Sequence, residues 1–250
     1  MKTFAEKQFV LATDLDGTFL GGSDAERSHL YDWIEQRRES VGLLFVTGRD
    51  PDFIRDLTSD GSVPSPDLVI GDVGTTIATF SRETGVEPIP ELEAQIVEAW
   101  GDSGDRVRTA LEGISGLTLQ PTEFRFRVSY DMDPKELDPR AFDIIQGMGF
   151  DVITSADRYF DVLPKGVSKG PSLLRLIDHL GLRKDKVLAA GDTLNDLSML
   201  AVGVPAVAVG GSEPDLLSAV ADMDHVFKAK RIGAAGIFEA IGAFGLHTDA

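Results

Sequence analysis

Short runs of mostly hydrophobic residues recur along the chain and are separated by stretches in which hydrophobic residues return at helical spacing. The runs that predict strands are 9–13, 43–46, 67–70, 187–190 and 205–209. Most of these runs are hydrophobic almost throughout rather than alternating, which is typical of parallel strands covered on both faces. Strands that alternate with helices predict an α/β fold with a Rossmann-like parallel sheet.

The middle of the chain follows a different pattern. The predicted elements there are a helix over 91–100 that extends toward residue 111, strands over 117–120 and 124–130, a helix over 139–148, and a hairpin of 150–154 with 159–163. In 124–130 hydrophobic and polar residues alternate, which indicates an antiparallel strand with one exposed face, the side of Arg127 and Ser129. We therefore expect an inserted α+β cap domain over 82–164 and a core domain made of 1–81 and 165–250.

Polar residues follow several of the predicted parallel strands directly. Asp14, Thr47, Asp72 and Asp192 each stand at or just past the end of such a run. Because ligands of open α/β sheets bind at the carboxyl ends of the strands, we expect these residues to face one crevice. The composition adds that no cysteine is present, so disulfides and thiolate chemistry are excluded.

Two pairs of carboxylates stand out at these strand ends. Asp14 and Asp16 precede Gly17, and Asp192 is followed four residues later by Asp196. Taken singly, each pair is also explained by a turn or a helix cap. Gathered at one sheet edge, the four carboxylates would repel one another, and oxygen-rich sites of this kind favour Mg²⁺.

A lysine and a threonine complete the candidate site. Lys169 stands at the start of the apolar helix predicted over 173–180, and Thr47 ends the second strand. A cation and a hydroxyl beside a magnesium site suit a phosphoryl group. The predicted chemistry is therefore Mg²⁺-dependent handling of a phosphate ester.

The charge of the chain limits its partners. There are 41 acidic against 24 basic residues, a net charge of −17, so a polyanion such as nucleic acid is not an expected partner. No hydrophobic run approaches the roughly 18 residues of a membrane span, and we expect a soluble cytoplasmic protein. An ordinary acidic enzyme is favoured over adaptation to high salt as the explanation of the charge.

Four motifs in order resemble those of the haloacid dehalogenase superfamily of Mg²⁺-dependent phosphatases. The motifs are Asp14-x-Asp16-Gly17-Thr18, Thr47, Lys169 and Gly191-Asp192-x-x-Asn195-Asp196. The insert between the second and third motifs resembles the larger, α+β (type IIB) cap of that superfamily. Further stretches, Gly71–Ile77, Arg127–Tyr130 and Asp161–Pro164, resemble the sucrose-phosphate phosphatase branch more loosely.

The resemblance implies a two-step hydrolysis. Asp14 would attack phosphorus to form an aspartyl-phosphate, and Asp16 would protonate the sugar alkoxide and then activate water. Mg²⁺ would be held by the carboxylates of Asp14 and Asp192 and the backbone carbonyl of Asp16, with Asp196 orienting water or Lys169. The implied substrate is sucrose 6-phosphate or a related disaccharide or glycoside phosphate, and a broad-specificity sugar-phosphate phosphatase is the alternative.

The resemblance also implies substrate contacts in both domains. In the core, Thr47, Gly48, Lys169 and Asn195 would contact the phosphate. In the cap, sugar hydroxyls would meet polar side chains, with Arg127, Ser129, Arg158, Asp161 and Lys165 as candidates. For each of these a solvated surface position is an equally good interpretation.

Three other classes of protein share parts of this sequence pattern. A receiver-like phospho-acceptor domain also uses strand-end Asp, Thr and Lys around Mg²⁺, but it needs no built-in acid–base residue such as Asp16. The string 166–170 formally matches a serine-hydrolase elbow, yet it follows Pro164-Lys165 rather than a clean strand end. A non-catalytic module would not require all four motifs. Association with a glycosyl-phosphate synthase remains open.

Overall fold

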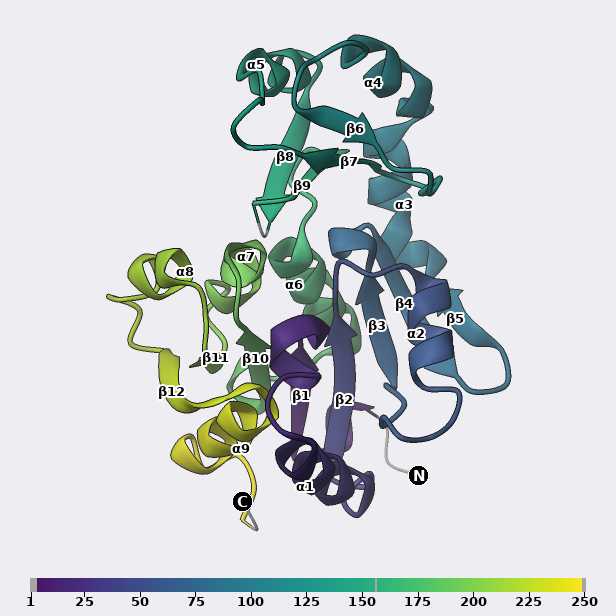
Figure 1. Ribbon diagram of the computed structural model, residues 1–250. Helices are drawn as coiled ribbons and strands as arrows, with labels where there is room; N and C mark the ends of the chain where they lie inside the picture. The colour runs from purple at the N-terminus through teal and green to yellow at the C-terminus, as the bar shows by residue number, and fades with distance from the viewer. Residues whose placement is uncertain (1–3, 156, 249–250) are drawn as a thin grey trace. The chain divides into compact units, whose positions relative to one another are not determined.

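The computed structural model describes residues 4–155 and 157–248 and divides into two compact units (Figure 1). The core unit comprises 4–89 and 169–248 among the described residues, and the inserted unit comprises 90–168. The sequence predicted the same arrangement of an insert within a core, with boundaries after residues 81 and 164. Each unit has a sheet of its own, as expected for α/β and α+β organisation.

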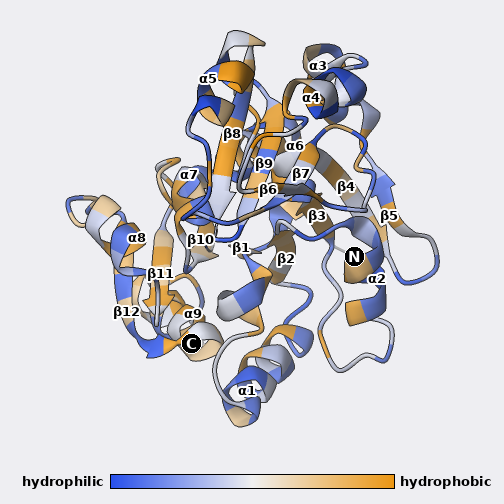
Figure 2. Cartoon of the chain, turned by 45° about the horizontal axis from the view of Figure 1, so that its top comes forward, coloured by the Kyte–Doolittle hydropathy of each residue, from blue (hydrophilic) through white to orange (hydrophobic). Residues whose placement is uncertain are grey.

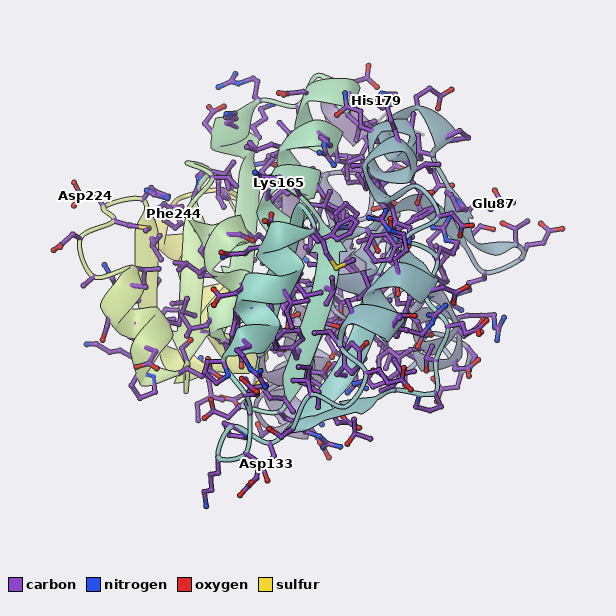
Figure 3. The ribbon with its side chains drawn as sticks, turned by 90° about the horizontal axis from the view of Figure 1, so that it is seen from above. Glu87, Asp133, Lys165, His179, Asp224 and Phe244 are labelled. Atoms are coloured by element: carbon purple, nitrogen blue, oxygen red, sulfur yellow. The ribbon has the colours of Figure 1, made fainter. Side chains whose placement is uncertain are left out.

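The core unit contains an eight-stranded sheet in the order β12-β11-β10-β1-β2-β3-β4-β5. Its strands are β1 (Phe9–Thr13), β2 (Val41–Val46), β3 (Leu68–Gly71), β4 (Thr76–Ser81), β5 (Gly85–Pro88), β10 (Val187–Gly191), β11 (Ala206–Gly210) and β12 (Val226–Ile232). The strands from β12 to β3 run parallel, while β4 and β5 are antiparallel. Glu87 of β5 and Asp224, just before β12, lie at opposite ends of this sheet (Figure 3).

Most helices of the core unit connect one parallel strand to the next, and the last helix follows the last strand. The helices are α1 (Asp24–Glu35), α2 (Pro51–Leu57), α6 (Lys169–Leu180), α7 (Leu197–Leu200), α8 (Pro214–Ala219) and α9 (Gly233–Ala243). Helix α1 begins at a capping box in which Ser23 and Glu26 satisfy each other's backbone N–H groups. Its mixed colouring in Figure 2 matches an amphipathic helix, whose buried side includes Leu30 and Ile34.

Hydrophobic burial explains why the predicted strands form. Every residue of β1, β2 and β10 is buried. One face of the sheet packs with residues of α1, α2 and α9 in a single hydrophobic cluster that contains Phe9, Phe45 and Ile237. The parallel register places Thr13 beside both Phe45 and Ala190, so β1, β2 and β10 end next to one another. The polar residues that follow these strands are thereby brought to one edge.

The inserted unit contains a four-stranded antiparallel sheet in the order β6-β7-β9-β8. Its elements are α3 (Pro90–Trp100), α4 (Gly104–Ala110), β6 (Leu117–Leu119), β7 (Val128–Met132), α5 (Arg140–Gly147), β8 (Phe150–Ser155) and β9 (Tyr159–Pro164). A hydrophobic cluster that includes Trp100, Ile145 and Phe160 holds the helices to one face of the sheet. The predicted α+β character of the insert therefore agrees with its observed structure.

Three details of this region differ from the sequence prediction. The hairpin of β4 and β5 extends the core sheet, pairing Ala78 with Pro88, so the insert begins after Ile89 rather than at Arg82. The helix over 91–111 is two helices, because Gly101 takes a left-handed φ of 56° and ends α3. The strand predicted over 124–130 begins only at Val128.

Candidate active site

The carboxyl edge of the core sheet collects the predicted motif residues. The backbone N–H of Asp14, directly after β1, donates to the carbonyl of Ala190 in β10 at 2.9 Å. Thr47 follows β2 and donates its N–H to Ile70 of β3 at 2.8 Å. Asp192 follows β10 directly. The backbones of Asp14 and Thr47 are thus bonded to a neighbouring strand, and Asp192 directly continues β10, which pairs with β1.

Gly17 allows the first motif to pack against the last. Its φ is +79°, and a Cβ atom at this position would lie 2.2 Å from Oδ2 of Asp192. The hydroxyl of Thr18 donates to Oδ1 of the same carboxylate at 2.6 Å. A side chain larger than hydrogen at residue 17 would therefore displace Asp192, which explains the Asp-Gly-Thr sequence physically.

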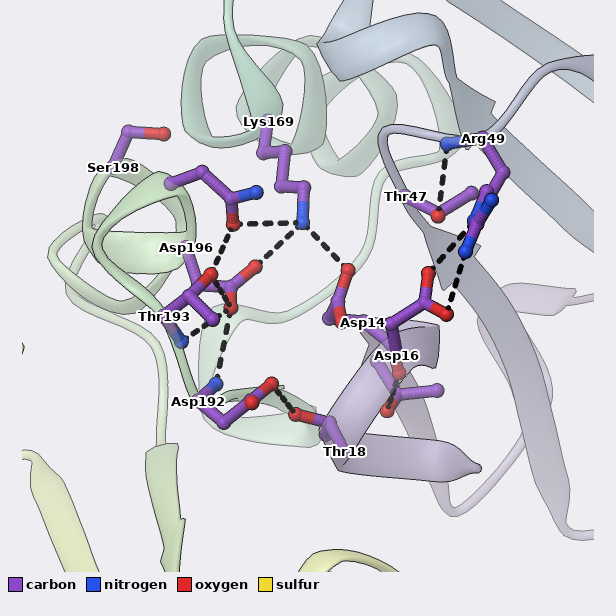
Figure 4. Close-up of polar contacts among 12 residues, drawn as sticks. Asp14, Asp16, Thr18, Thr47, Arg49, Lys169, Asp192, Thr193, Asp196 and Ser198 are labelled. Carbon is purple, nitrogen blue, oxygen red and sulfur yellow. Dashed lines mark hydrogen bonds and ion pairs between the residues drawn. The ribbon is translucent and has the colours of Figure 1, made fainter. Parts of the chain in front are cut away.

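Lys169 lies at the centre of the site and is fully buried (Figure 4). Its Nζ donates to Oδ1 of Asp14 at 2.6 Å, to Oδ1 of Asp196 at 2.6 Å and to Oδ1 of Asn195 at 3.2 Å. These three acceptors match the three N–H groups of an ammonium. Lys169 thereby links the first and last motifs, as the sequence interpretation required.

Asp196 is engaged entirely within the protein. Besides Lys169, its carboxylate accepts the backbone N–H groups of Asp192 at 3.0 Å and Thr193 at 3.1 Å, both at Oδ2. Both oxygens are therefore committed to the chain, and the residue is fully buried. Asp196 is placed to hold Lys169 and the loop after β10 in position, rather than to offer a vacant ligand oxygen.

The acidic cluster holds more negative charge than its lysine offsets. Burial raises the pKa of Asp14 to about 8, against the attraction of Lys169, with Asp196 and Asp192 adding to the rise. Burial likewise raises the pKa of Asp192 to about 6, although the Thr18 hydroxyl opposes this. Burial alone would lower the pKa of Lys169, but Asp14 and Asp196 raise it, so its charge is secure.

The donor set of the cluster fits a hard divalent cation. Carboxylate oxygens of Asp14, Asp192 and Asp196 all lie within 4.8 Å of one another. The Oδ2 atom of Asp192 stands outside the hydrogen bond to Thr18, and carboxylate oxygens of this kind suit Mg²⁺. Asp16, also predicted as a ligand residue, has its carboxylate outside this cluster.

The carboxylate of Asp16 is paired with Arg49 instead (Figure 4). Nε and Nη2 of Arg49 donate to its two oxygens at 2.9 and 3.0 Å. The sequence analysis assigned no role to Arg49, which stands two residues after Thr47. The two partners are 33 residues apart, in the segments that follow β1 and β2, so only the pairing of β1 with β2 brings them together.

A strained turn supports the Thr47 loop. Asp72 and Val73 have φ of 52° and 59°, values uncommon for any residue other than glycine and a true outlier for a β-branched one. Their N–H groups donate to the carbonyls of Arg49 at 3.0 Å and Thr47 at 3.2 Å. The hydroxyl of Thr47 in turn accepts the N–H of Arg49 at 3.1 Å. Such strain is commonly found where a functional loop must be held in place.

The predicted exposure of Arg127 and Ser129 is wrong. They are 5% and 2% exposed, and both donate to Oδ1 of Asp161 on the neighbouring strand β9. The guanidinium of Arg127 also lies 3.6 Å from the ring centroid of Phe124, which folds over it. Burial raises the pKa of Asp161, against the opposing effects of Arg127 and Ser129. The alternation in sequence was real, but its polar side forms a buried ion pair.

The remaining predicted cap residues are exposed. Lys165 lies just after β9, where its side chain reaches the surface (Figure 3), and Arg158 pairs loosely with Asp131 at 3.9 Å. Because these residues belong to the inserted unit, their predicted contacts with substrate stay predictions. The same holds for Arg127 and Ser129.

Three of the comparisons with known proteins match phosphatases. A family model for sucrose-6F-phosphate phosphohydrolase matches residues 7–245. A mannosylfructose-phosphate phosphatase of Agrobacterium fabrum is 28% identical over 95% of this chain and 97% of its own length. The structure of the sucrose-phosphatase of Synechocystis in complex with sucrose and phosphate superimposes with a TM-score of 0.83 at 26% identity, covering 96% of this chain and 98% of that one.

A further relative is longer than this chain. A glucosylglycerol-phosphate synthase of Pseudomonas anguilliseptica is 44% identical over 94% of this chain. The matched region is only 31% of the synthase's length, so this chain spans about a third of it. Among the described residues, no helix combines the length and hydrophobicity needed to cross a bilayer.

Proposed function

Because the chain belongs to the sucrose-6F-phosphate phosphohydrolase family and is a phosphoric monoester hydrolase of the haloacid dehalogenase superfamily, we propose that it hydrolyses a glycoside phosphate through a covalent intermediate on Asp14. The observation that carries this proposal is the buried Lys169, bonded at once to Asp14 and Asp196. It holds one oxygen of Asp14 and leaves the other for reaction.

In the proposed first step, Oδ2 of Asp14 attacks phosphorus as the bond to the sugar oxygen breaks. Asp16 supplies a proton to that departing oxygen, so the alkoxide leaves as an alcohol. In the second step Asp16 takes a proton from water, the water oxygen bonds to phosphorus, and the bond to Asp14 breaks to release inorganic phosphate. Lys169 stays charged throughout and offsets the charge of Asp14 and of the phosphoryl oxygens.

A magnesium ion fits this scheme through the chain's own ligands. Asp14 and Asp192 would hold it, and Asp196 would keep Lys169 and the loop after β10 in place behind them. When bound, the ion supplies positive charge to the phosphoryl oxygens. The Thr47 hydroxyl and the N–H of Gly48 are proposed to bind a phosphoryl oxygen, and the hydrogen bonds of Asp72 and Val73 to Arg49 and Thr47 support their loop.

The proposed substrate is a phosphorylated disaccharide or glycosyl polyol. The names of the relatives support this class, since they concern sucrose, mannosylfructose phosphate and glucosylglycerol phosphate. A glycosyl-phosphate synthase makes such an ester, and a synthase that contains a related segment supports the proposal that one acts just before this enzyme. Polar residues of the inserted unit, including Arg158 and Lys165, are proposed to bind the sugar.

Phosphate release with Mg²⁺ from a panel of esters tests this function. The panel contains sucrose 6-phosphate, mannosylfructose phosphate, glucosylglycerol phosphate, trehalose 6-phosphate and glucose 6-phosphate. We expect one glycoside phosphate to exceed the others by at least about tenfold in kcat/KM, and Asp14→Asn to lose activity by roughly 10⁴-fold or more. Equal weak turnover of all esters would show a broad-specificity phosphatase. Stable phosphorylation of Asp14 without turnover would show a phospho-acceptor.

A further inference from the structure

Arg49 and Asp16 form an ion pair at the mouth of the proposed site. The planar guanidinium meets both carboxylate oxygens, at 2.9 and 3.0 Å. The side chains are 47% and 55% exposed, so water reaches both partners. An exposed pair of this kind contributes little stability and opens readily.

This pair is incompatible with the role proposed for Asp16. Both oxygens of this carboxylate are engaged by the guanidinium, so the side chain is not directed at a leaving group. If the proposed function holds, Asp16 must separate from Arg49 before the sugar oxygen departs. Something must therefore replace the carboxylate as the partner of Arg49.

The rest of the core site needs a further cation. The cluster of Asp14, Asp192 and Asp196 holds three carboxylates against the single positive charge of Lys169, so a bound divalent cation brings the group only to neutrality. The three N–H groups of Lys169 are already donated to Asp14, Asn195 and Asp196. A phosphate dianion entering this site needs a cation with N–H groups to offer, and the fork of Arg49 suits phosphate geometry.

The structure allows the side chain of Arg49 to move while its backbone stays in place. Its N–H is bonded to the Thr47 hydroxyl and its carbonyl to the N–H of Asp72. The guanidinium also lies 4.5 Å from the ring centroid of Phe53, a contact that does not depend on Asp16. It stands only two residues beyond Thr47, the proposed phosphate ligand.

We propose that Arg49 binds the phosphoryl group of the substrate, exchanging Asp16 for phosphate as the ester enters. The exchange couples binding to chemistry, because the arrival of phosphate frees Asp16 to act on the leaving oxygen. Arg49 then offsets part of the charge of the phosphoryl group. This inference rests on the proposed function for its purpose, but its binding step is measurable by itself.

Titration calorimetry with inorganic phosphate in the presence of Mg²⁺ tests the exchange. Arg49→Met is expected to raise the dissociation constant about 10- to 100-fold, since two charge-assisted hydrogen bonds are lost. Asp16→Asn is expected to lower it severalfold, because Arg49 no longer has a competing carboxylate. The matched control is Arg55→Met on α2, which removes one exposed arginine near the site without touching Asp16 and should stay within about twofold.

A double variant separates the exchange from a simple change of net charge. If the exchange is correct, Asp16→Asn tightens phosphate binding in the wild type but not in the Arg49→Met variant. If Asp16 acts only through its negative charge, Asp16→Asn tightens phosphate binding equally in both. With p-nitrophenyl phosphate, whose leaving group needs no proton, Arg49→Met should raise KM more than it lowers kcat.

Two results overturn the inference. One is phosphate binding by Arg49→Met equal to that of Arg55→Met, and the other is equal tightening by Asp16→Asn in both backgrounds. Folding of each variant is checked by circular dichroism, and Arg49→Lys, which keeps the charge, should restore part of the binding. Arg49-dependent phosphate binding without hydrolysis of any ester would refute the proposed function and leave the binding role intact.

Discussion

Both units of this protein bury a cation among carboxylates, but in different proportions. In the core, Lys169 contacts Asp14 and Asp196, and Asp192 lies within the same acidic cluster. In the inserted unit, Arg127 faces the single carboxylate of Asp161, which also accepts from a serine hydroxyl.

The difference in charge balance indicates a structural role for the pair in the inserted unit and a binding role for the core cluster. The pair in the inserted unit is balanced one to one, as in a structural ion pair whose remaining cost is desolvation. The core cluster sets three carboxylates against one lysine, and burial, with a smaller contribution from neighbouring carboxylates, raises the pKa of Asp14 to about 8 and of Asp192 to about 6. Excess charge in a buried site is unfavourable unless a ligand neutralises it, so the excess indicates a binding site for a cation.

The largest expected effects on the free energy of unfolding come from replacing each of the two buried cations in turn. Lys169→Met leaves several buried carboxylates without a cation, and we expect the free energy of unfolding to fall by about 3–5 kcal/mol, with loss of hydrolysis. Arg127→Met leaves one carboxylate that keeps its serine donor, and about 1–3 kcal/mol is expected. Urea unfolding at pH 7 measures both. A loss for Arg127→Met as large as that for Lys169→Met would contradict the contrast between the clusters.

The pH dependence of stability sharpens the same comparison. Without metal, the carboxyl of Asp14 ionises near 3.8 in the unfolded chain but only near 8 in the fold. Between these pH values the unfolded state binds fewer protons, so the free energy of unfolding should fall as pH rises, by on the order of a few kcal/mol. Asp192 adds to the fall between 3.8 and about 6.

Asp14→Asn is the matched variant for this prediction. Denaturation in EDTA from pH 4 to 8 should show most of the slope lost in Asp14→Asn, because an amide does not titrate. Added Mg²⁺ should stabilise the wild type more at pH 8 than at pH 5, since it favours the ionised carboxylates. Equal slopes for wild type and variant would show that Asp14 is not the group responsible.

Alanine substitutions at two glycines give the smallest expected change in stability, and they distinguish backbone strain from a clash within the site. Gly17 and Gly149 have φ of +79° and +85°, so alanine at either position should cost about 1 kcal/mol of strain. A Cβ atom at residue 17 also meets Asp192, whereas at residue 149 nothing lies within 4 Å. Gly17→Ala should therefore weaken Mg²⁺ binding in calorimetry, and Gly149→Ala should leave it unchanged. Equal Mg²⁺ affinity in both variants would remove the role assigned to Gly17.

Local hydrophobic pattern was enough to predict the strands that build the candidate site. β1, β2 and β10 are fully buried runs, and such runs need no knowledge of their partners to be identified. The convergence of Asp14, Thr47 and Asp192 followed from a general property of parallel sheets. The pairing of Arg49 with Asp16 followed from no such rule, because it depends on which strands are neighbours.

The inserted unit was less predictable for a related reason. Alternation in 124–130 correctly separated hydrophobic from polar positions, but exposure of the polar side depends on what else reaches that face. There Asp161 from β9 and the ring of Phe124 meet Arg127, and the ion pair is buried. The first boundary of the insert was displaced because the hairpin of β4 and β5 continues the core sheet, a pairing between strands that local pattern does not specify.

By itself, the sequence determined the fold class, the positions of the buried strands and the candidate residues at the strand ends, because these depend on local hydrophobicity and on residue type. The tertiary structure alone decided how the charges are shared: Lys169 among Asp14, Asn195 and Asp196, and Arg49 with Asp16. The physical reason is that electrostatic energy depends on distances of a few ångströms between groups far apart in the chain, and those distances exist only once the strands have taken their register.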